Sequence, residues 1–501
     1  MKPTGYNIKI IFGLKLKQLR QDRNLSLSEL AKRSGLSISY LNEIESGKKY
    51  PKTDKIAVLS DALEVTYDKL VSLKLTRNLA PLGDLLESNI LEQLPLDHYG
   101  IDLNKLIVLM ANAPLQLSAL VTTLIEMAKS SELSQNNFSR TALRTYKEFN
   151  ENYFEDLEKA VDNFVKKSRF SNKPPVKYSG LLKLISKQFG FDVDENSLKN
   201  YPELSGIRGV FISSEPKRLL INPKLSEPQK AFILGKEIAY QYLGITDRSN
   251  MYSASRVDSF DQLLNDFRTS YFSTALMLKK ESILKDLKRF LGMRKWDDRK
   301  LFELIKKYYV TPEMFLQRFT NLASKFLNLN SYFFLRFNTA RNSNEYNLTK
   351  ELRLNTIENP GGYQSIEHYC RRWVSIWVLK KLEKSGRKAG TIDNPVIGAQ
   401  ISEFKNTGDR YFSISIARKS RTTEGNNSSV TVGFLINDEF KERIRFWNDK
   451  NVLVKIVNDT CERCLIKDCK ERVANPVAAE KQTKYKNMRT ALDKLLNEMQ
   501  R

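Results

Sequence analysis

The sequence predicts a multidomain protein that is mainly α-helical and has a C-terminal α/β part. The chain has 501 residues, which is more than one hydrophobic core usually holds, so roughly two to four domains are expected. Helix-capping patterns and apolar residues at helical spacing predominate up to residue 320. After residue 328, runs of β-branched and aromatic residues between turns predict strands.

The composition argues against a membrane protein and favours a polyanionic partner. Hydrophobic residues make up 41% and charged residues 28% of the chain, which is ordinary for a folded soluble protein. No apolar run approaches the roughly 18 residues of a membrane span, and the N-terminus lacks the features of a secretory signal. We expect a cytoplasmic protein without a membrane partner, whose thiolates are free to bind metal. The net charge of +24 predicts a polyanionic binding partner, with nucleic acid ranked first, an acidic membrane second and phosphorylated ligands third. The alternative is a lysine-rich, solvated surface that binds no such partner.

Residues 8–75 predict a compact domain of five short helices. Ser26 is followed three residues later by a glutamate, which is a capping-box pattern that starts a helix. Gly35 supplies a turn, and Ser37 caps the next predicted helix, residues 38–45. A helix, a glycine-containing turn and a second helix form the helix-turn-helix layout, whose second helix enters the major groove of DNA. A helical bundle used only for protein interaction is the alternative.

The exposed face of the second helix supplies candidate DNA contacts. Asn42 suits an adenine, Ser39 suits several bases, and Ile38 suits a thymine methyl group. Basic residues around the helix suit phosphates. The predicted DNA-contacting residues are Arg20, Ser28, Ser37, Ile38, Ser39, Tyr40, Asn42, Lys48 and Lys49. Because one such module covers few base pairs, we expect a homodimer on a double-stranded operator.

The segment 25–51 resembles the helix-turn-helix of the phage-repressor-like (Xre) family. Residues 80–170 are low in glycine and proline and predict a helical linker or dimerisation region. In residues 176–320, two strand-like runs lead into an amphipathic helix from Pro228. This order resembles the IrrE/ImmA peptidase-like domain, which implies a helix bearing H-E-x-x-H, with two histidines on zinc and a glutamate that activates water.

The matching stretch of this chain departs from that zinc-binding pattern. Lys236 and Tyr240 stand at the two histidine positions around Glu237, and Asp266 stands at the family's acidic ligand position. The chain has only two histidines in all, and neither lies near this stretch in the sequence. We therefore expect an IrrE-like degenerate metallopeptidase domain that is not an enzyme. Glu237 is then predicted to be a structural partner and not a general base.

Residues 328–476 predict a GAF-like or α+β sensor domain. Strand-like runs occur at residues 332–337, 411–417 and 430–436, with helical stretches between them, which suggests one antiparallel sheet. The segment after it, residues 477–501, predicts an amphipathic helix without an assigned role.

The four cysteines of the chain are candidates for one metal site. Cys461, Cys464 and Cys469 follow a C-x2-C-x4-C pattern, and Cys370 lies upstream. Four thiolates hold either a structural zinc ion or a 4Fe–4S cluster. Their spacing does not separate the two, and free thiols are a third alternative. His368 is an alternative ligand to Cys370.

The order of these features resembles the short-chain fatty acyl transcriptional regulator family. The resemblance rests on the two N-terminal domains, residues 317–322, 369–373 and 410–418, and the pattern C-x2-C-x4-C-x2-R-x3-P ending at Pro476. It implies control of acetate or propionate metabolism genes, a short-chain acyl-CoA effector, and an iron–sulfur cluster in preference to zinc. The family's Pro-Leu-Trp run is replaced by Arg-Arg-Trp after Cys370.

With an acyl-CoA effector, basic residues on the predicted strands become candidate phosphate contacts, namely Arg336, Arg410 and Arg418. The sequence therefore predicts a ligand-responsive transcriptional regulator. Two other classes stay open at this point. One is a regulatory zinc protease that cleaves a repressor, which the missing histidines disfavour. The other is a phage-type or toxin–antitoxin repressor without a metabolite ligand.

Overall fold

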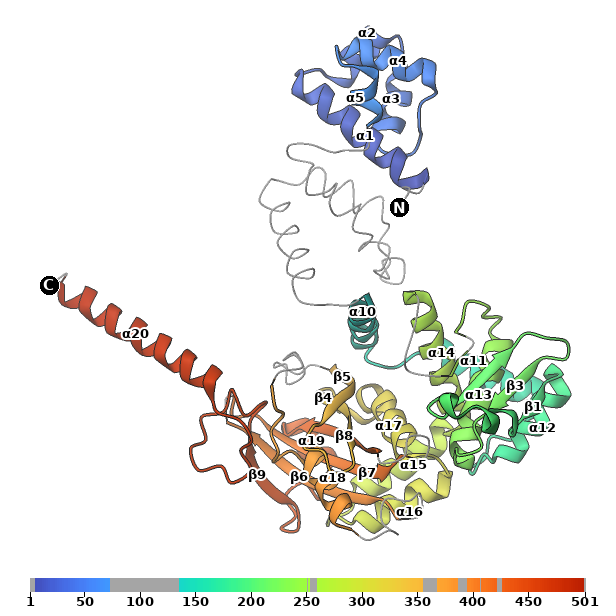
Figure 1. Ribbon diagram of the computed structural model, residues 1–501, viewed down its shortest axis with the longest axis vertical. Helices are drawn as coiled ribbons and strands as arrows, with labels where there is room; N and C mark the ends of the chain where they lie inside the picture. Colours follow the sequence, from blue (N-terminus) through green and yellow to red (C-terminus); the bar gives the residue numbers. More distant parts are fainter. Residues whose placement is uncertain are drawn as a thin grey trace. The chain divides into compact units, whose positions relative to one another are not determined.

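The computed structural model describes residues 5–72, 135–249, 251–252, 259–354, 367–385, 394–405, 407–420 and 426–499 (Figure 1). The chain forms two units: residues 1–146 with 257–260, and residues 147–256 with 261–501. Most of the predicted helical linker, residues 80–134, lies outside the described residues. Within the described ranges, no helix is both long enough and apolar enough to cross a membrane.

The N-terminal unit contains the five predicted helices, so that prediction is confirmed. They are α1 (Gly5–Asp22), α2 (Leu27–Ser34), α3 (Ile38–Glu45), α4 (Thr53–Ala62) and α5 (Tyr67–Val71). The capping box at Ser26 forms as predicted, and Gly35 adopts the left-handed backbone, with φ 66°, that ends α2. Helix α1 approaches α3 closely at Gly13, where an added Cβ atom would lie 2.2 Å from the carbonyl oxygen of Ile44.

The second unit begins with helices around a small sheet. These elements are α10 (Gln135–Phe149, which starts in the first unit), α11 (Glu155–Ser168), α12 (Tyr178–Phe189), β1 (Asp192–Asp194), β2 (Gly209–Ile212), β3 (Arg218–Ile221) and α13 (Glu227–Tyr242). The strand order is β1-β3-β2, with β1 parallel and β2 antiparallel to β3. The two predicted strands and the helix that follows them are thus confirmed. Helix α13 is buried along most of its length, which makes it the centre of this part.

Four further helices connect the small sheet to a larger one. They are α14 (Phe260–Met277), α15 (Lys280–Leu291), α16 (Asp298–Tyr308) and α17 (Pro312–Leu327). Helix α17 is buried nearly throughout. At its centre the guanidinium of Arg318 is fully buried and makes a two-pronged ion pair with Glu158 of α11. This pair ties the start of the unit to its middle.

The larger sheet has six strands in the order β5-β4-β8-β7-β6-β9. They are β4 (Tyr332–Ala340), β5 (Asn347–Leu354), β6 (Val396–Phe404), β7 (Arg410–Lys419), β8 (Asn426–Leu435) and β9 (Leu453–Val457). All neighbours pair antiparallel except β6 with β9, so the predicted antiparallel sheet is confirmed apart from that parallel edge.

Helix α18 (Val374–Lys384) packs on one face of this sheet, against β4, β6, β7 and β8. Aromatic contacts such as Phe319 with Phe434 join α17 to the other face, near α19 (Asp438–Arg443). The chain continues into α20 (Val477–Met499), which confirms the predicted C-terminal helix and extends away from the sheet (Figure 1).

Candidate functional site

The N-terminal half of α3 presents a row of exposed side chains. Ser37, Ser39 and Asn42 are exposed, and Ile38 is 50% exposed although it is apolar. The Ser37 hydroxyl also holds the helix, because it accepts a hydrogen bond from the backbone N–H of Tyr40 at 3.2 Å. A helix anchored from its inner face and bare at its N-terminal end has the geometry that major-groove recognition requires.

Other predicted DNA contacts flank α3. Ser28, Lys48 and Lys49 are exposed. The Nζ atom of Lys49 lies 5.0 Å from the centre of the Tyr40 ring and 3.4 Å from the Glu43 carboxylate. Both charged partners are about half exposed, so water screens this pair and a phosphate can replace it at little cost. Contact of these residues with DNA stays a prediction.

Arg20 does not belong to this surface, which corrects the prediction of a phosphate contact. Its guanidinium is buried and donates to both carboxylate oxygens of Glu45, at 2.7 and 2.9 Å. A third hydrogen bond, at 2.7 Å, goes to the carbonyl oxygen of Leu25. The hydrogen bond with Glu45 raises the pKa of Arg20. Arg20 therefore ties α1 to the end of α3 and positions the helix from inside.

In the second unit, the place where the peptidase-like pattern expects zinc holds an internal ion pair. Lys236 of α13, at the first histidine position, pairs with Asp266 of α14, at the acidic-ligand position. Tyr240, at the second histidine position, is buried. An ammonium group has no lone pair to offer a metal. The Lys236–Asp266 ion pair therefore occupies two positions at which the pattern expects zinc ligands.

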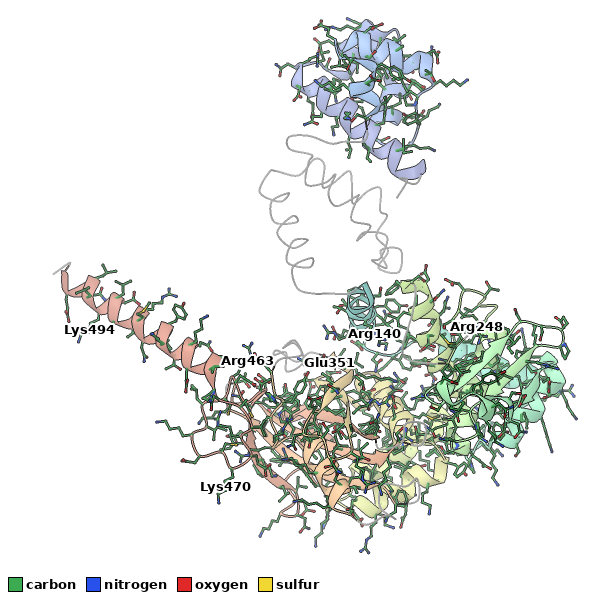
Figure 2. All side chains as sticks on the ribbon, in the orientation of Figure 1. Arg140, Arg248, Glu351, Arg463, Lys470 and Lys494 are labelled. Atoms are coloured by element: carbon green, nitrogen blue, oxygen red, sulfur yellow. The ribbon has the colours of Figure 1, made fainter. Side chains whose placement is uncertain are left out.

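Glu237, which would activate water in an intact site, is fully buried and enclosed by donors. Its carboxylate accepts hydrogen bonds from Arg248 at 2.8 and 2.7 Å and another from the hydroxyl of Tyr252. The Arg248 guanidinium also stacks 3.8 Å from the centre of the Tyr240 ring, in the part of the unit that holds α13 (Figure 2). These contacts agree with the structural role predicted for Glu237.

Three of the four cysteines gather in one buried cluster. Cys370 and Cys461 lie on two short segments that are joined by one antiparallel β-bridge, between Tyr369 and Thr460. The N–H of Cys370 donates to the Asp459 carbonyl at 3.0 Å, and the N–H of Cys461 donates to the His368 carbonyl at 2.9 Å. Cys464 follows in a turn that its own N–H closes on the Cys461 carbonyl at 3.2 Å. All three thiols are buried, whereas Cys469 is only partly so.

The thiols suit a metal centre by type, although their side chains do not form a closed ligand set. Burial raises the pKa of the Cys370 thiol to about 11, and the nearby Cys461 and Cys464 act in the same direction. Among the residues that the structure describes, no group of three or more His, Cys, Asp or Glu side chains is arranged to hold a metal ion. A cofactor at this cluster therefore stays a prediction.

The sequence pattern includes Arg472, but it did not indicate that this residue shapes the cysteine loop. The Arg472 guanidinium donates to the carbonyl oxygens of Cys461 at 3.1 Å, Cys464 at 3.0 Å and Ile466 at 2.6 Å. It thereby gathers the carbonyl groups of the turn around one cation. The only signal in the sequence was its spacing of two intervening residues after Cys469.

Side chains around the cluster are paired with one another. The Nδ1 atom of the half-exposed His368 ring lies 2.7 Å from the Glu462 carboxylate, which also accepts the His368 backbone N–H at 3.0 Å. Arg463 donates twice to Glu367, at 2.9 and 2.8 Å. The sequence left His368 open as an alternative metal ligand. In the structure its ring interacts with the Glu462 carboxylate.

The three arginines predicted to meet effector phosphates are not brought together, which corrects the prediction of a shared site. Arg410 begins β7 and Arg418 lies near its far end, about 27 Å away along an extended strand. Arg336 of β4 is mostly buried, with Nη1 3.4 Å from the Glu313 carboxylate. Arg410 is half exposed, with Nε 3.9 Å from Glu403.

A small apolar cavity lies between α18 and the sheet. Phe333, Trp373, Phe404 and Ser413 are among the residues that line it. The Ser413 hydroxyl is buried there and makes no hydrogen bond with the described residues. The N–H of Trp373 donates to the Cys370 carbonyl at 3.1 Å. The cavity therefore adjoins the cysteine cluster, and none of the three predicted effector arginines lines it.

Comparison with known proteins identifies two domains. Residues 16–70 match the helix-turn-helix family model, and residues 189–320 match that of the IrrE N-terminal-like domain. The transcriptional repressor RghR of Bacillus subtilis (strain 168) is 39% identical over 61 residues, which is 12% of this chain and 45% of that protein. The uncharacterized regulator RghRB of the same organism is 39% identical over 62 residues, with the same coverage. The chain thus spans under half the length of these curated relatives.

A solved structure of a Mycobacterium tuberculosis transcriptional regulator aligns with 67% of this chain and 93% of its own, at a TM-score of 0.48 and 15% identity. The family-model matches place a DNA-binding helix-turn-helix domain and an IrrE-like domain in one chain.

Proposed function

We propose that this protein is a cytoplasmic, sequence-specific transcriptional regulator of short-chain acyl-CoA metabolism. The observation that carries the proposal is the exposed N-terminal half of α3 on a domain that matches the helix-turn-helix family. The second unit supplies what a bare DNA-binding module lacks, namely an apolar cavity next to a cluster of thiols. Ligand or metal binding in that unit would regulate the DNA-binding unit.

In this proposal the IrrE-like domain is a scaffold without peptidase activity. The Lys236–Asp266 ion pair occupies two of the family's three zinc-ligand positions, and Arg248 holds the carboxylate that would activate water. A zinc-dependent cleavage assay on a partner repressor tests the rival function. Cleavage that a chelator abolishes would replace our proposal with a regulatory protease.

We further propose that Cys370, Cys461, Cys464 and Cys469 hold an iron–sulfur cluster, with zinc as the alternative metal. Such a cluster supplies a redox-responsive centre when it is bound. The burial of three neighbouring thiols supports this, as do the hydrogen bonds from Arg472 to the carbonyl groups of the loop. The chain's own contribution is to bring Cys370 beside the C-terminal cysteines through the pairing of its segment with residues 459–461.

Anaerobic purification followed by iron, sulfide and zinc analysis tests this centre. We expect iron, sulfide and a broad visible absorption in the wild-type protein, and loss of all three in Cys464→Ser. Glu471→Gln is the matched control, because that carboxylate lies in the same segment and pairs with Lys380 outside the cluster. A colourless wild-type protein with one zinc per chain would exclude the iron–sulfur cluster.

The effector that we propose is a short-chain acyl-CoA, whose acyl group would enter the cavity under α18. The Ser413 hydroxyl, which has no hydrogen-bond partner among the described residues, and the surrounding aromatic rings suit a small group with one carbonyl oxygen. Genome-wide mapping of binding sites with and without propionate or acetate is the decisive experiment. Occupancy that changes near acyl-CoA genes supports the proposal, whereas unchanged occupancy together with no metal and no acyl-CoA binding favours a phage-type repressor.

The proposal includes a homodimer, since a two-fold operator needs two helix-turn-helix modules. Helix α20 supports this, because exposed apolar side chains recur along it at alternating spacings of three and four residues, namely Tyr485, Met488, Leu492 and Leu495. That spacing is typical of helices that pair as a coiled coil. Sedimentation of the full chain and of a chain ending at residue 476 checks the contribution of α20.

A further inference from the structure

Positive side chains from several parts of the second unit converge beside the former zinc position. Asp266, the partner of Lys236, also interacts electrostatically with Lys350 and Arg208. Arg208 directly precedes β2 of the IrrE-like part, whereas Lys350 lies on β5 of the large sheet. The Asp266 carboxylate therefore interacts with basic residues from both the IrrE-like part and the large sheet of this unit.

A second carboxylate continues the same group. Glu313 of α17 accepts a hydrogen bond from Lys350 at 2.6 Å and lies 3.4 Å from Arg336. Arg208 acts on Glu313 as well. Lys147 of α10 completes the group, because it interacts with both Lys350 and Asp266. We call the whole set the cationic cluster; it consists of Lys147, Arg208, Lys236, Asp266, Glu313, Arg336 and Lys350.

The charges of the cationic cluster do not balance. Five cations face two carboxylates, which leaves an excess of three positive charges. Among the described residues, the side chain of Arg208 makes no hydrogen bond or close ion pair, and Lys147 meets only the Phe267 ring, at 4.3 Å. The Nε atom of Arg336 is buried and has no hydrogen-bond partner in the part of the chain that the structure describes. Cations that are held together without counterions are costly unless an anion joins them.

The cluster is buried on one side and open on the other. The side chains of Lys236, Glu313 and Arg336 are mostly buried, whereas those of Lys350 and Asp266 are 45% and 52% exposed. A small ligand can therefore enter from solvent and reach buried donors. Burial and the neighbouring Lys350 together lower the pKa of Lys147 to about 8. A bound anion would relieve that repulsion.

We propose that the cationic cluster is a binding site for a small multivalent phosphate-bearing anion. Guanidinium and ammonium groups are the side chains that bind phosphate most strongly, and two arginines with three lysines suit an anion of two or more charges. The peptidase pattern binds a metal cation through histidines at this position. In this chain, lysines and arginines around the same position would bind an anion instead.

Such a ligand would join three parts of the unit. Its contacts would come from α10, from the IrrE-like part through Arg208 and Lys236, and from the large sheet through Arg336 and Lys350. Lys147 is the first residue of the second unit on a helix that begins in the first.

Calorimetric titration of the full chain with inorganic pyrophosphate, at constant ionic strength, tests the site. We expect binding to the wild-type protein and at least about tenfold weaker binding to Lys350→Met. Lys325→Met is the matched control, because Lys325 is also about half exposed and paired with a carboxylate, but lies outside the cluster. No pyrophosphate binding, or equal affinity in the two variants, would overturn the proposal.

Arg208→Gln provides an independent test that does not disturb a closed ion pair. Its melting temperature should stay near that of the wild type, while pyrophosphate binding weakens. Unchanged binding in this variant also counts against the proposal. Basal operator binding of both variants should be unaffected, which separates failure of this site from failure of the DNA-binding function.

Phosphate groups can come from a free phosphorylated metabolite or from the nucleotide part of coenzyme A. Competition between pyrophosphate and coenzyme A distinguishes these sources. Displacement of pyrophosphate would make the cationic cluster the phosphate-binding part of the acyl-CoA site, an assignment that rests on the proposed function. Independent binding of the two would assign the cluster to a separate phosphorylated metabolite.

Discussion

The Arg318–Glu158 pair and the cationic cluster are both groups of charges inside the second unit, yet they are arranged on opposite principles. Arg318 meets one carboxylate with two hydrogen bonds, and its Nε donates to the Leu278 carbonyl at 3.1 Å. The cationic cluster instead has more cations than carboxylates and is partly open to solvent. Burial of charge alone therefore does not mark a functional site, whereas burial with an uncompensated excess does.

The largest effect is expected from breaking the matched pair. Arg318→Met leaves Glu158 buried without its cation, which should lower the free energy of unfolding by about 3–5 kcal/mol. Denaturant unfolding followed by circular dichroism measures this. Lys325→Met serves as the control, since its exposed ion pair is screened by water and should shift the midpoint little. A small loss in the Arg318 variant would mean that the pair is not a closed structural unit.

The pH dependence of the same variant gives a second measurement. Burial opposes ionisation of Glu158, but Arg318 and its hydrogen bonds outweigh burial, so the pKa of Glu158 is lowered. The wild-type pair therefore adds stability above the unfolded pKa of roughly 4.3 and loses it as pH falls through the folded value. Without Arg318 the pKa of the buried acid rises, so its penalty shrinks at low pH. The stability gap between the two proteins should narrow as pH falls.

The N-terminal unit repeats the contrast on a smaller scale. Arg20 and Glu45 form a matched buried pair, whereas Asn42 on α3 is exposed. Asn42→Ala should keep the melting temperature and reduce operator affinity by about 1–3 kcal/mol, roughly 5- to 150-fold. Fluorescence anisotropy with operator and unrelated DNA measures the change. An equal loss on both DNAs would show that Asn42 does not specify a base.

These cases show which features the sequence could predict. The bounds of α3 followed from local signals, because Ser37 and Gly35 act within a few residues of themselves. Arg20 was misplaced because its partner lies 25 residues away and leaves no local pattern. The cationic cluster was missed for the same reason, since Lys147 and Lys350 are far apart in the sequence. Of the predicted effector residues, Arg336 belongs to that cluster, but no sequence motif indicates which residues surround it.

Removing a carboxylate of the cationic cluster should destabilise the protein less than Arg318→Met does, and it should strengthen anion binding. Burial raises the pKa of Glu313, but Arg336, Lys350 and Arg208 hold it well below its usual range. Glu313→Gln should lower the free energy of unfolding by about 2–3 kcal/mol, because the buried cations lose a counter-charge, yet strengthen pyrophosphate binding several-fold. Calorimetry and thermal unfolding measure both changes. Glu303→Gln, which removes an exposed carboxylate on α16, is the control.

Stronger anion binding after loss of a carboxylate would separate the two kinds of buried charge directly. In the Arg318–Glu158 pair, removal of either partner only weakens the protein. In the cationic cluster, removal of Glu313 increases the charge excess on which the ligand depends. Weaker pyrophosphate binding in Glu313→Gln would instead show that this carboxylate positions the cations, and the contrast between the two regions would fail.

The smallest effect is expected on the exposed side of the N-terminal unit. Lys49 and Glu43 are half exposed and 3.4 Å apart, so Lys49→Gln should leave the unfolding transition within about 0.5 kcal/mol of the wild type. If Lys49 exchanges Glu43 for a phosphate, operator affinity should fall on all DNA sequences alike, and the slope of log affinity against log salt should decrease by about one. An unchanged slope would place Lys49 outside the interface. In this variant we expect the salt dependence of DNA binding to change while the stability does not. It therefore tests whether an exposed charge contributes to ligand binding, whereas a buried ion pair contributes to the stability of the fold.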